Sequence, residues 1–265
     1  SMPVVSLVTS SSATVSWTPA DAAATSWDFE YGPAGFTPGT GSSTTVSTPT
    51  INLSGLMSLT AYDFYISEAC VSVAGNSNAI TGSFTTACGA YSTPYTEDFE
   101  GVTAGFAADY GNCWTTNGNS TNPKWEAEDA SGANENSFNT GPFFDKTTGA
   151  VGGMYMYMET SSPAALGDVA TLNGPSIDLS NLNVPAVYFY YHMYGSEMGT
   201  LALEVSDDNG ATWNSVWSIS GQQQTAGGDP WAQAIVPLVG YTGVVQIRFA
   251  GTTGIGFESD MAIDD

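Results

Sequence analysis

The stretch "FYYHMYGSEMGTLALEV", residues 189–205, decides the fold class of this chain. It begins with an aromatic run, and after a short polar segment Leu201, Leu203 and Val205 occupy alternate positions. Successive side chains of a strand point to opposite faces, so such alternation predicts half-buried strands on both sides of the polar segment. The stretch lacks the 3.6-residue period of an amphipathic helix. We therefore expect an all-β fold.

The same pattern continues on both sides of this stretch, from about residue 91 to residue 265. Short apolar or alternating runs are separated by Gly, Pro, Asn, Asp and Ser, which are typical turn formers. No helical period of useful length interrupts them. The runs predict strands at residues 95–100, 152–160, 168–177, 186–195, 200–208, 214–220, 232–238 and 244–253.

The first 87 residues carry shorter alternating runs, which predict a separate and smaller antiparallel sandwich. Trp17 lies in an early run, and "FEYGP" at residues 29–33 lies in a later one. Leu53 and Leu56 precede Tyr62 at the spacing of a tyrosine corner, in which a phenol hydroxyl ties a crossover to the sheet. In this order the motifs resemble a fibronectin type III domain, of the kind repeated in secreted Bacteroidetes proteins.

The larger segment carries a more specific set of motifs. The set includes "DFEG" (98–101), "GPFFDKT" (141–147), "GGMYMYMETSS" (152–162), "YHMYG" (191–195) and the terminal "DMAIDD" (260–265). It resembles a MAM domain and the MAM-like cleaved-adhesin modules that Bacteroidetes attach to secreted proteases and glycosidases. The resemblance implies an extracellular jelly-roll sandwich that serves adhesion or acts as an accessory module.

The two resemblances divide the chain into three parts. We expect a fibronectin type III domain at residues 1–87, a short linker at 88–94 and a MAM-like jelly roll at 95–265. The linker contains Pro94 and is short, so we expect the domains to touch rather than swing freely. The opening "SMPVV" resembles a cloning remnant on an excised fragment, so a missing signal peptide says nothing about secretion.

The charge of the chain narrows the choice of partner. The 265 residues carry 26 acidic and three basic side chains, a formal net charge of −23. Nucleic acids, anionic membranes and sulfated polysaccharides need Lys or Arg to neutralise them, so we expect none of these as partners. No run approaches the roughly 18 apolar residues of a membrane span, so we expect no membrane insertion. The remaining partners are a protein or a neutral glycan at the cell surface or in the extracellular matrix.

Cys70, Cys88 and Cys113 form an odd set, which suggests a lost partner or a free thiol. The strand expected between Cys70 and Cys88 carries the chain about 26 Å, whereas a disulfide requires Cα atoms within about 7 Å. We therefore expect a Cys88–Cys113 disulfide at the entry to the second domain, and a partner for Cys70 upstream of this sequence. Three reduced cysteines remain the alternative.

The residue inventory argues against catalysis. The only histidine, His192, lies among aromatic residues, and the chain has no GxSxG or HExxH motif. The stretch "SDDNGATW" at 206–213 fits the Asp-box of sialidases, but their catalysis depends on an arginine cluster, and this chain has one arginine. We expect Asp208 and Gly210 to form a hairpin turn that Trp213 caps. No catalytic residue is therefore predicted.

Carboxylates at the two ends of the second segment predict a metal site. The first and last strands of a jelly roll are commonly neighbours, and strand alternation would place Asp98 and Glu100 on one face, opposite Phe99. Carboxylates brought together repel, and a hard cation with six to eight oxygen ligands removes that penalty. The MAM resemblance adds Asp145 to the ligands. We expect structural calcium, with sodium as an alternative, held by Asp98, Glu100, Asp145, Asp264 and Asp265.

Two points about this metal site stay open. The residues do not decide whether Asp264 or Asp265, on opposite faces of the last predicted strand, points toward the opening segment. A solvated acidic edge without an ion is the alternative reading.

Tryptophan residues raise a second possibility, a sugar-stacking platform. Alternation places most of them in the sandwich core. Residues 221–233 form a polar, Gly-rich loop with Gln223 and Trp231, and residues 122–129 carry Trp125. These three side chains are the candidate contacts for a neutral glycan.

Together the observations predict a secreted, non-catalytic module of a larger protein, itself a protease or a polysaccharide-degrading enzyme. The module would serve adhesion, spacing or presentation of a partner. A carbohydrate-binding module for a neutral polysaccharide, attached to a secreted hydrolase, is the alternative.

Overall fold

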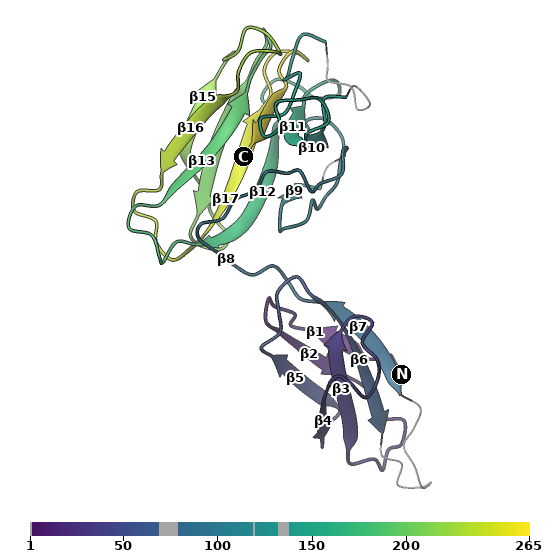
Figure 1. Ribbon diagram of the computed structural model, residues 1–265. Helices are drawn as coiled ribbons and strands as arrows, with labels where there is room; N and C mark the ends of the chain where they lie inside the picture. The colour runs from purple at the N-terminus through teal and green to yellow at the C-terminus, as the bar shows by residue number, and fades with distance from the viewer. Residues whose placement is uncertain (1, 69–78, 119, 132–137) are drawn as a thin grey trace. The chain divides into compact units, whose positions relative to one another are not determined.

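A computed structural model describes residues 2–68, 79–118, 120–131 and 138–265. The chain divides into two compact units, Ser1–Gly89 and Ala90–Asp265 (Figure 1). Every regular element in the described residues is a β-strand, so the all-β prediction is confirmed. Within the same residues no helix has the length and apolar character needed to cross a membrane.

The first unit is a sandwich of two antiparallel sheets. One sheet has the order β1 (Val4–Ser6), β2 (Ser12–Ser16), β5 (Thr50–Ser54). The other has the order β4 (Ser42–Val46), β3 (Trp27–Pro33), β6 (Ala61–Glu68), β7 (Ile80–Thr85). Alternate residues of these strands are buried in one core, where the rings of Phe29 and Phe64 stack with centroids 5.5 Å apart. This burial of apolar surface holds the two sheets together.

The predicted tyrosine corner is present in the first unit. The hydroxyl of Tyr62 accepts a hydrogen bond from the backbone N–H of Met57 at 3.0 Å. The Tyr62 ring is buried, so it anchors the loop before β6 to the core while its hydroxyl satisfies a backbone donor.

The second unit is a larger sandwich of two sheets. One has the order β15 (Asn214–Ser220), β14 (Thr200–Ser206), β17 (Val244–Thr252), β12 (Val169–Asp178), β8 (Tyr91–Ser92), and β9 (Thr115–Thr116) also pairs with β12. The other has the order β10 (Lys124–Glu128), β11 (Tyr155–Glu159), β18 (Met261–Asp264), β13 (Ala186–His192), β16 (Ala232–Pro237). The two halves of the 189–205 stretch thus become β13 and β14 in different sheets, and the polar segment between them is a crossover.

Strand β11 is buried on both faces. Met156 and Met158 face the main core between the sheets. Tyr155 and Tyr157 face the other way and pack with Trp231 in a second apolar cluster. The chain between β10 and β11 contributes to this cluster, so it covers the outer face of the five-stranded sheet. Polar side chains on that outer face are therefore buried as well.

Residues 95–100 form no strand, so this prediction is wrong. Phe99 has a φ of +54°, in the left-handed region, which an extended strand does not contain. Its ring is buried against Trp114, with centroids 5.1 Å apart, and this contact fixes the turn. The strand that opens the second unit is β8, which runs parallel to β12 and lies within the segment expected as a linker.

Candidate functional site

The predicted metal ligands Asp98, Glu100, Asp145, Asp264 and Asp265 lie on three segments of the second unit, and we call this set the acidic corner. Because residues 95–100 form no strand, Asp98 and Glu100 are placed by a turn and not by alternation. The Asp98 carboxylate accepts a hydrogen bond from the backbone N–H of Glu100 at 3.1 Å. The turn therefore sets the relative position of these two acids.

Asp145 is the most enclosed member of the acidic corner. Its side chain is completely buried and accepts hydrogen bonds from the hydroxyl of Thr148 at 2.6 Å and the backbone N–H of Ala150 at 3.1 Å. Burial alone raises the pKa of Asp145, but the hydrogen bonds outweigh it and hold the pKa below its usual value. A Cβ atom on Gly153 would collide with this carboxylate, so the glycine leaves the space that the carboxylate occupies.

Glu100 lies against Asp145. Its Oε1 accepts a hydrogen bond from the backbone N–H of Met154 at 3.1 Å, and its carboxyl group also shares a hydrogen bond with Asp145. Burial, together with the negative charges of Asp145 and Asp98, raises the pKa of Glu100. The shifts in pKa of the two groups run in opposite directions, up for Glu100 and down for Asp145. The same position between the two groups suits a cation.

Asp264 and Asp265 form the other half of the acidic corner. Asp264 is buried and accepts a hydrogen bond from the backbone N–H of Lys146 at 2.8 Å. Burial, with a contribution from the charge of Asp265, raises the pKa of Asp264 to about 7. Asp265 accepts a hydrogen bond from the hydroxyl of Thr147 at 2.7 Å, and the Lys146 ammonium lies 3.8 Å from its carboxylate. The segment after Asp145 therefore joins the two halves.

The acidic corner is assembled as neighbouring pairs. Asp98, Asp264 and Asp265 line one cavity, and Glu100 and Asp145 form a separate contact. In the described part of the chain, no three Asp, Glu, His or Cys side chains are grouped closely enough to hold a metal ion as placed. The donor set is nevertheless all oxygen, which is the ligand type of calcium and sodium.

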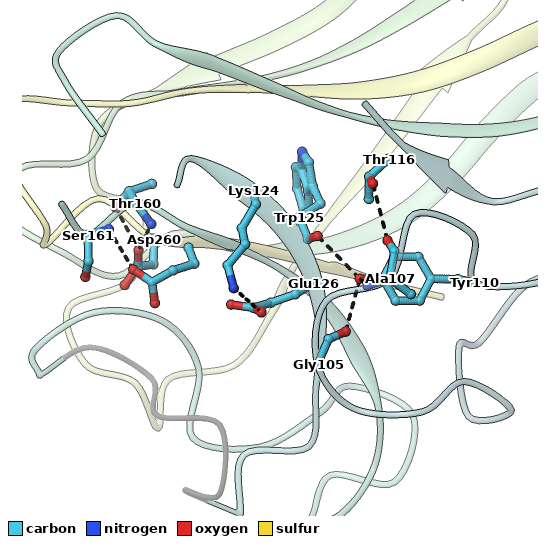
Figure 2. Close-up of polar contacts among 11 residues, drawn as sticks. Gly105, Ala107, Tyr110, Thr116, Lys124, Trp125, Glu126, Thr160, Ser161 and Asp260 are labelled. Atoms are coloured by element: carbon cyan, nitrogen blue, oxygen red, sulfur yellow. Dashed lines mark hydrogen bonds and ion pairs between the residues drawn. The ribbon is translucent and has the colours of Figure 1, made fainter. Parts of the chain in front are cut away.

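A second row of acids lies on the outer face of β10 and β11, and sequence reasoning missed it. Glu126 and Glu128 alternate along β10, and Glu159 lies opposite Lys124 in the β10–β11 register. The Lys124 ammonium is 2.7 Å from the Glu126 carboxylate (Figure 2). Charged and apolar residues alternate in "KWEAE" (124–128), and "YMYME" (155–159) ends in an acid, which could have indicated a row of acids on one face of the sheet. The sequence did not show that another segment covers this face.

Glu128 is the unusual member of this row. Its side chain is 2% exposed, and Oε1 has no hydrogen-bond partner among the described residues. Burial, followed by the charges of Glu126, Asp129 and Glu159, raises the pKa of Glu128 to about 8. Glu128 is therefore largely neutral at pH 7.

Asp260 occupies the same covered face. Its carboxylate accepts a hydrogen bond from the hydroxyl of Tyr157 at 2.6 Å. It accepts another from the backbone N–H of Thr160 at 2.7 Å (Figure 2). Burial, and then the charge of Glu159, raises the pKa of Asp260 to about 7. The Asp260 carboxyl group therefore links the start of β18 to the end of β11, which is a structural role.

Trp125 does not form part of a sugar platform. Its ring is completely buried, and its indole N–H donates to the carbonyl of Ala170 at 3.1 Å. Tyr110 holds the preceding loop against the same strand, because its hydroxyl bonds to the carbonyls of Gly105 and Trp125 (Figure 2). The ring therefore has no face available for a sugar.

Trp231 is also buried, contrary to its predicted role. Its ring packs edge-on against Tyr155, and its indole N–H donates to the carbonyl of Phe144 at 3.0 Å. Gln223 is exposed, and its amide folds back onto the carbonyls of Ser220 and Gly221. The three candidate glycan contacts are thus two core tryptophans and a surface glutamine.

The 206–213 stretch is a hairpin turn, as predicted. Asp208 accepts hydrogen bonds from the backbone N–H and the hydroxyl of Thr212, and Gly210 has a φ of +83°. Trp213 closes the turn, and the Arg248 guanidinium lies 4.2 Å from the centroid of its ring. Arg248 is also paired with Glu204 at 2.6 Å, so the only arginine serves the structure of the sheet.

His192 is completely buried beside Trp231, with ring centroids 5.5 Å apart. Burial lowers its pKa to about 4, so the imidazole is neutral at pH 7. Within the described residues neither ring nitrogen has a hydrogen-bond partner, and the ring does not meet a nucleophile.

Cys88 and Cys113 are disulfide-bonded, which confirms the predicted pair. Cys70, and with it the expectation of an upstream partner, lies outside the described residues.

The second unit is a two-sheet β-sandwich module, with the carboxylates of the acidic corner on its opening turn, on the 145–147 segment and at the end of its last strand. The family model "MAM domain, meprin/A5/mu" matches residues 104–265, and the chain belongs to this family. The human MAM domain-containing glycosylphosphatidylinositol anchor protein 1 is 41% identical over 155 residues, 58% of this chain. The human MAM domain-containing glycosylphosphatidylinositol anchor protein 2 is 33% identical over 184 residues, 66% of this chain. The chain spans 16% and 18% of the lengths of these relatives.

Three solved structures are similar to this chain at low TM-scores. The K1 cleaved adhesin domain of Lys-gingipain from Porphyromonas gingivalis W83 is similar over 63% of this chain and 92% of that chain, with 17% identity and a TM-score of 0.42. A structure titled for carbohydrate-binding modules of the β-sandwich superfamily is similar over 99% of this chain and 95% of that chain, with 16% identity and a TM-score of 0.38. The fibronectin type III domain of human collagen alpha-1(XX) covers 35% of this chain and 88% of its own, with 20% identity and a TM-score of 0.30.

Proposed function

We propose that this chain is a non-catalytic adhesion or accessory module of a larger secreted or cell-surface protein. Membership of the MAM family over the second unit is the observation that carries the proposal. In this proposal the first unit, a two-sheet sandwich with a tyrosine corner, serves as a fibronectin type III spacer. The parent protein in this proposal is a secreted Bacteroidetes hydrolase, as the resemblance of the motifs implies. His192 is buried, and Arg248 is paired with Glu204. Both observations support a structural role for side chains of the types that hydrolases often use in catalysis.

Binding and hydrolysis assays on the whole chain test this proposal. The chain, coupled to beads, is offered extracellular-matrix proteins, cell surfaces and an array of neutral glycans in millimolar calcium. We expect saturable binding to a protein surface and no hydrolysis of peptide or glycan substrates. Turnover of a substrate by the purified chain, persisting after contaminating enzymes are excluded, would contradict the non-catalytic role. Binding to neutral glycans alone would favour the carbohydrate-binding alternative.

We also propose that the acidic corner holds a structural calcium ion, with sodium as a weaker substitute. The contact between Glu100 and Asp145 supports this proposal, because a cation placed there would offset the charges of Asp145 and Asp98, which together with burial raise the pKa of Glu100. Asp98, Asp264 and Asp265, which line one cavity, are the further carboxylates that would have to move toward that position. When bound, the ion would cross-link the opening turn, the segment after residue 145 and β18.

Chelation tests the calcium proposal. Extracellular calcium sites with Kd of about 10⁻⁴–10⁻³ M contribute about 2 kcal/mol at a few tens of Kd, so EDTA should lower the Tm of the second unit by several degrees. Asp145→Asn should abolish this calcium dependence. Asp207→Asn, which removes an exposed acid of the 206–213 turn, is the matched control and should retain it. Identical calorimetric curves with EDTA and with calcium would rule the ion out.

A further inference from the structure

Loops at one end of the second sandwich carry a group of exposed apolar side chains. Strands β12 and β14 begin at this end and β13 and β17 finish there, because Thr200 pairs with Thr252 and Val169 also pairs with Thr252. The exposed side chains are Phe138, Phe143, Leu166, Ile255 and Phe257, with exposed fractions of 80%, 58%, 69%, 74% and 48%. We call these five residues the loop-end patch.

Hydrogen bonds between the loops hold the loop-end patch together. The backbone N–H of Gly141 donates to the carbonyl of Tyr194 at 3.0 Å, and that of Phe143 donates to the carbonyl of Gly227 at 2.9 Å. The loop before β12 joins the same end, since the backbone N–H of Gly167 donates to the carbonyl of Thr253 at 3.2 Å. A surface whose loops are already fixed loses little conformational entropy when a partner binds.

The rim of the loop-end patch is acidic. Glu258 accepts hydrogen bonds from Ser196 at 2.5 Å and from Asn139 at 3.4 Å, and Glu197 accepts one from the backbone N–H of Glu258 at 3.3 Å. The loops at residues 138–143, 161–168, 194–198, 225–229 and 253–258 contain no Lys or Arg. The three basic residues of the chain lie elsewhere, each paired with an acid. The rim therefore presents negative charge without internal neutralisation.

From these observations we propose that the loop-end patch is the docking surface for a basic protein segment that also carries apolar anchors. Exposed apolar groups rimmed by polar residues mark interaction sites, and aromatic side chains dominate their binding energy. Charge complementarity selects the partner, because a basic segment is attracted by the rim and by the net charge of −23. A second copy of the chain and an anionic membrane are both repelled by the same charge. The inference deepens the proposed adhesive function and rests on it.

A peptide selection on the whole chain tests the inference. A phage-displayed library of random dodecapeptides is selected at 150 mM salt, and enriched peptides are synthesised and measured by fluorescence anisotropy. We expect peptides with several Lys or Arg and at least two large apolar residues. The double substitution Ile255→Ser and Phe257→Ser should raise Kd at least tenfold, and Glu197→Gln with Glu258→Gln should raise Kd and weaken its salt dependence.

A matched control comes from the opposite end of the same sandwich. Val184 and Val239 are 79% and 86% exposed, and they lie beyond the ends of β13 and β16 that pair through Ala186 and Pro237. The double substitution Val184→Ser and Val239→Ser, like the Ile255→Ser and Phe257→Ser pair, leaves the net charge unchanged, and it should change Kd less than twofold. Circular dichroism of both variants verifies that the fold is retained.

Several outcomes would overturn the inference. Enrichment of acidic or uncharged peptides, no enrichment at all, or equal effects of the two serine pairs would each do so. The inference would also be overturned if the unsubstituted chain dimerised in sedimentation experiments and the Ile255→Ser/Phe257→Ser variant did not. Binding of neutral glycans that this variant loses would overturn it in the same way. If the variant still adheres to cells or matrix as the unsubstituted chain does, the docking surface is wrong and the adhesive function stands. If the unsubstituted chain binds no surface, the proposed function itself fails.

Discussion

At the residue scale, single side chains whose surroundings oppose their charge have the largest consequences. Glu128 is an acid on a strand whose outer face is covered, so the protein stabilises its neutral form. Gly153 is the reverse case, a missing side chain that makes room for the charged group of Asp145. Both positions lead to substitutions with a defined direction.

Replacing Glu128 with glutamine should stabilise the second unit, increasingly so as the pH rises. The unfolded chain ionises this group near pH 4.5 and the folded chain near pH 8, so its contribution to stability is present at low pH and is lost across this window. The loss is about 1.4 kcal/mol for each pH unit inside the window. Thermal melts of both proteins from pH 5 to 8 should diverge with pH, whereas parallel curves would contradict the raised pKa. Asp207→Asn, which removes an exposed acid of the 206–213 turn, serves as the control.

Replacing Gly153 with alanine should destabilise the second unit by about 1–3 kcal/mol, the usual cost of overpacking. The added Cβ would meet the Asp145 carboxylate, which is held on its other side by Thr148 and Ala150. Gly101→Ala is the control, since a Cβ there meets nothing within 4 Å. Equal denaturant midpoints for the two variants would show that the Asp145 pocket relaxes without cost.

At the element scale, local patterns were predictable where the chain itself supplies the partners. The turn at 206–213 was predicted because its partners are local: Thr212 donates hydrogen bonds to Asp208, and Gly210 between them has a positive φ. The prediction of a strand at 95–100 was wrong because the ring of Phe99 packs on Trp114. The alternation of residues within 95–100 carries no information about this more distant partner. The glycan platform failed for the same physical reason: the cover over Trp231 is a distant segment of the chain.

The tyrosine corner offers a test at this scale. Tyr62→Phe keeps the buried ring and removes the hydroxyl that accepts from Met57, so the first unit should lose about 1 kcal/mol, the net value of one hydrogen bond. Tyr65→Phe is the control, because its ring lies on the other face of β6 against Phe36. Urea denaturation gives the free energy of unfolding of each variant. An equal loss in both variants would mean that the hydrogen bond of the tyrosine corner does not stabilise the first unit.

At the scale of the whole molecule, charge is the dominant feature. Twenty-six acids against three bases make self-repulsion a general term in stability, independent of any one site. The sequence alone fixed this quantity, together with the fold class. The placement of Asp98, Asp264 and Asp265 along one cavity, in contrast, depends on how a turn and a central strand are brought together, which no local pattern encodes.

Salt should therefore stabilise the protein. Raising the ionic strength from 10 to 150 mM shortens the Debye length from about 30 Å to about 8 Å and screens the repulsion among surface acids. We expect the Tm to rise with sodium chloride and equally with tetramethylammonium chloride, whose cation is too large to be held by carboxylates in a closed site. A rise with sodium alone would assign the effect to binding at the acidic corner and not to screening.

The position of β18 has a consequence for synthesis. Met261–Asp264 fills the centre of the five-stranded sheet, hydrogen-bonded to β11 on one side and β13 on the other. A ribosome makes both neighbours long before it makes this strand, so until then each presents an unpaired edge in the nascent chain. The second unit can thus close only after translation has passed residue 264, and its assembly is a late event that relies on the chain staying free of misplaced strands while it waits.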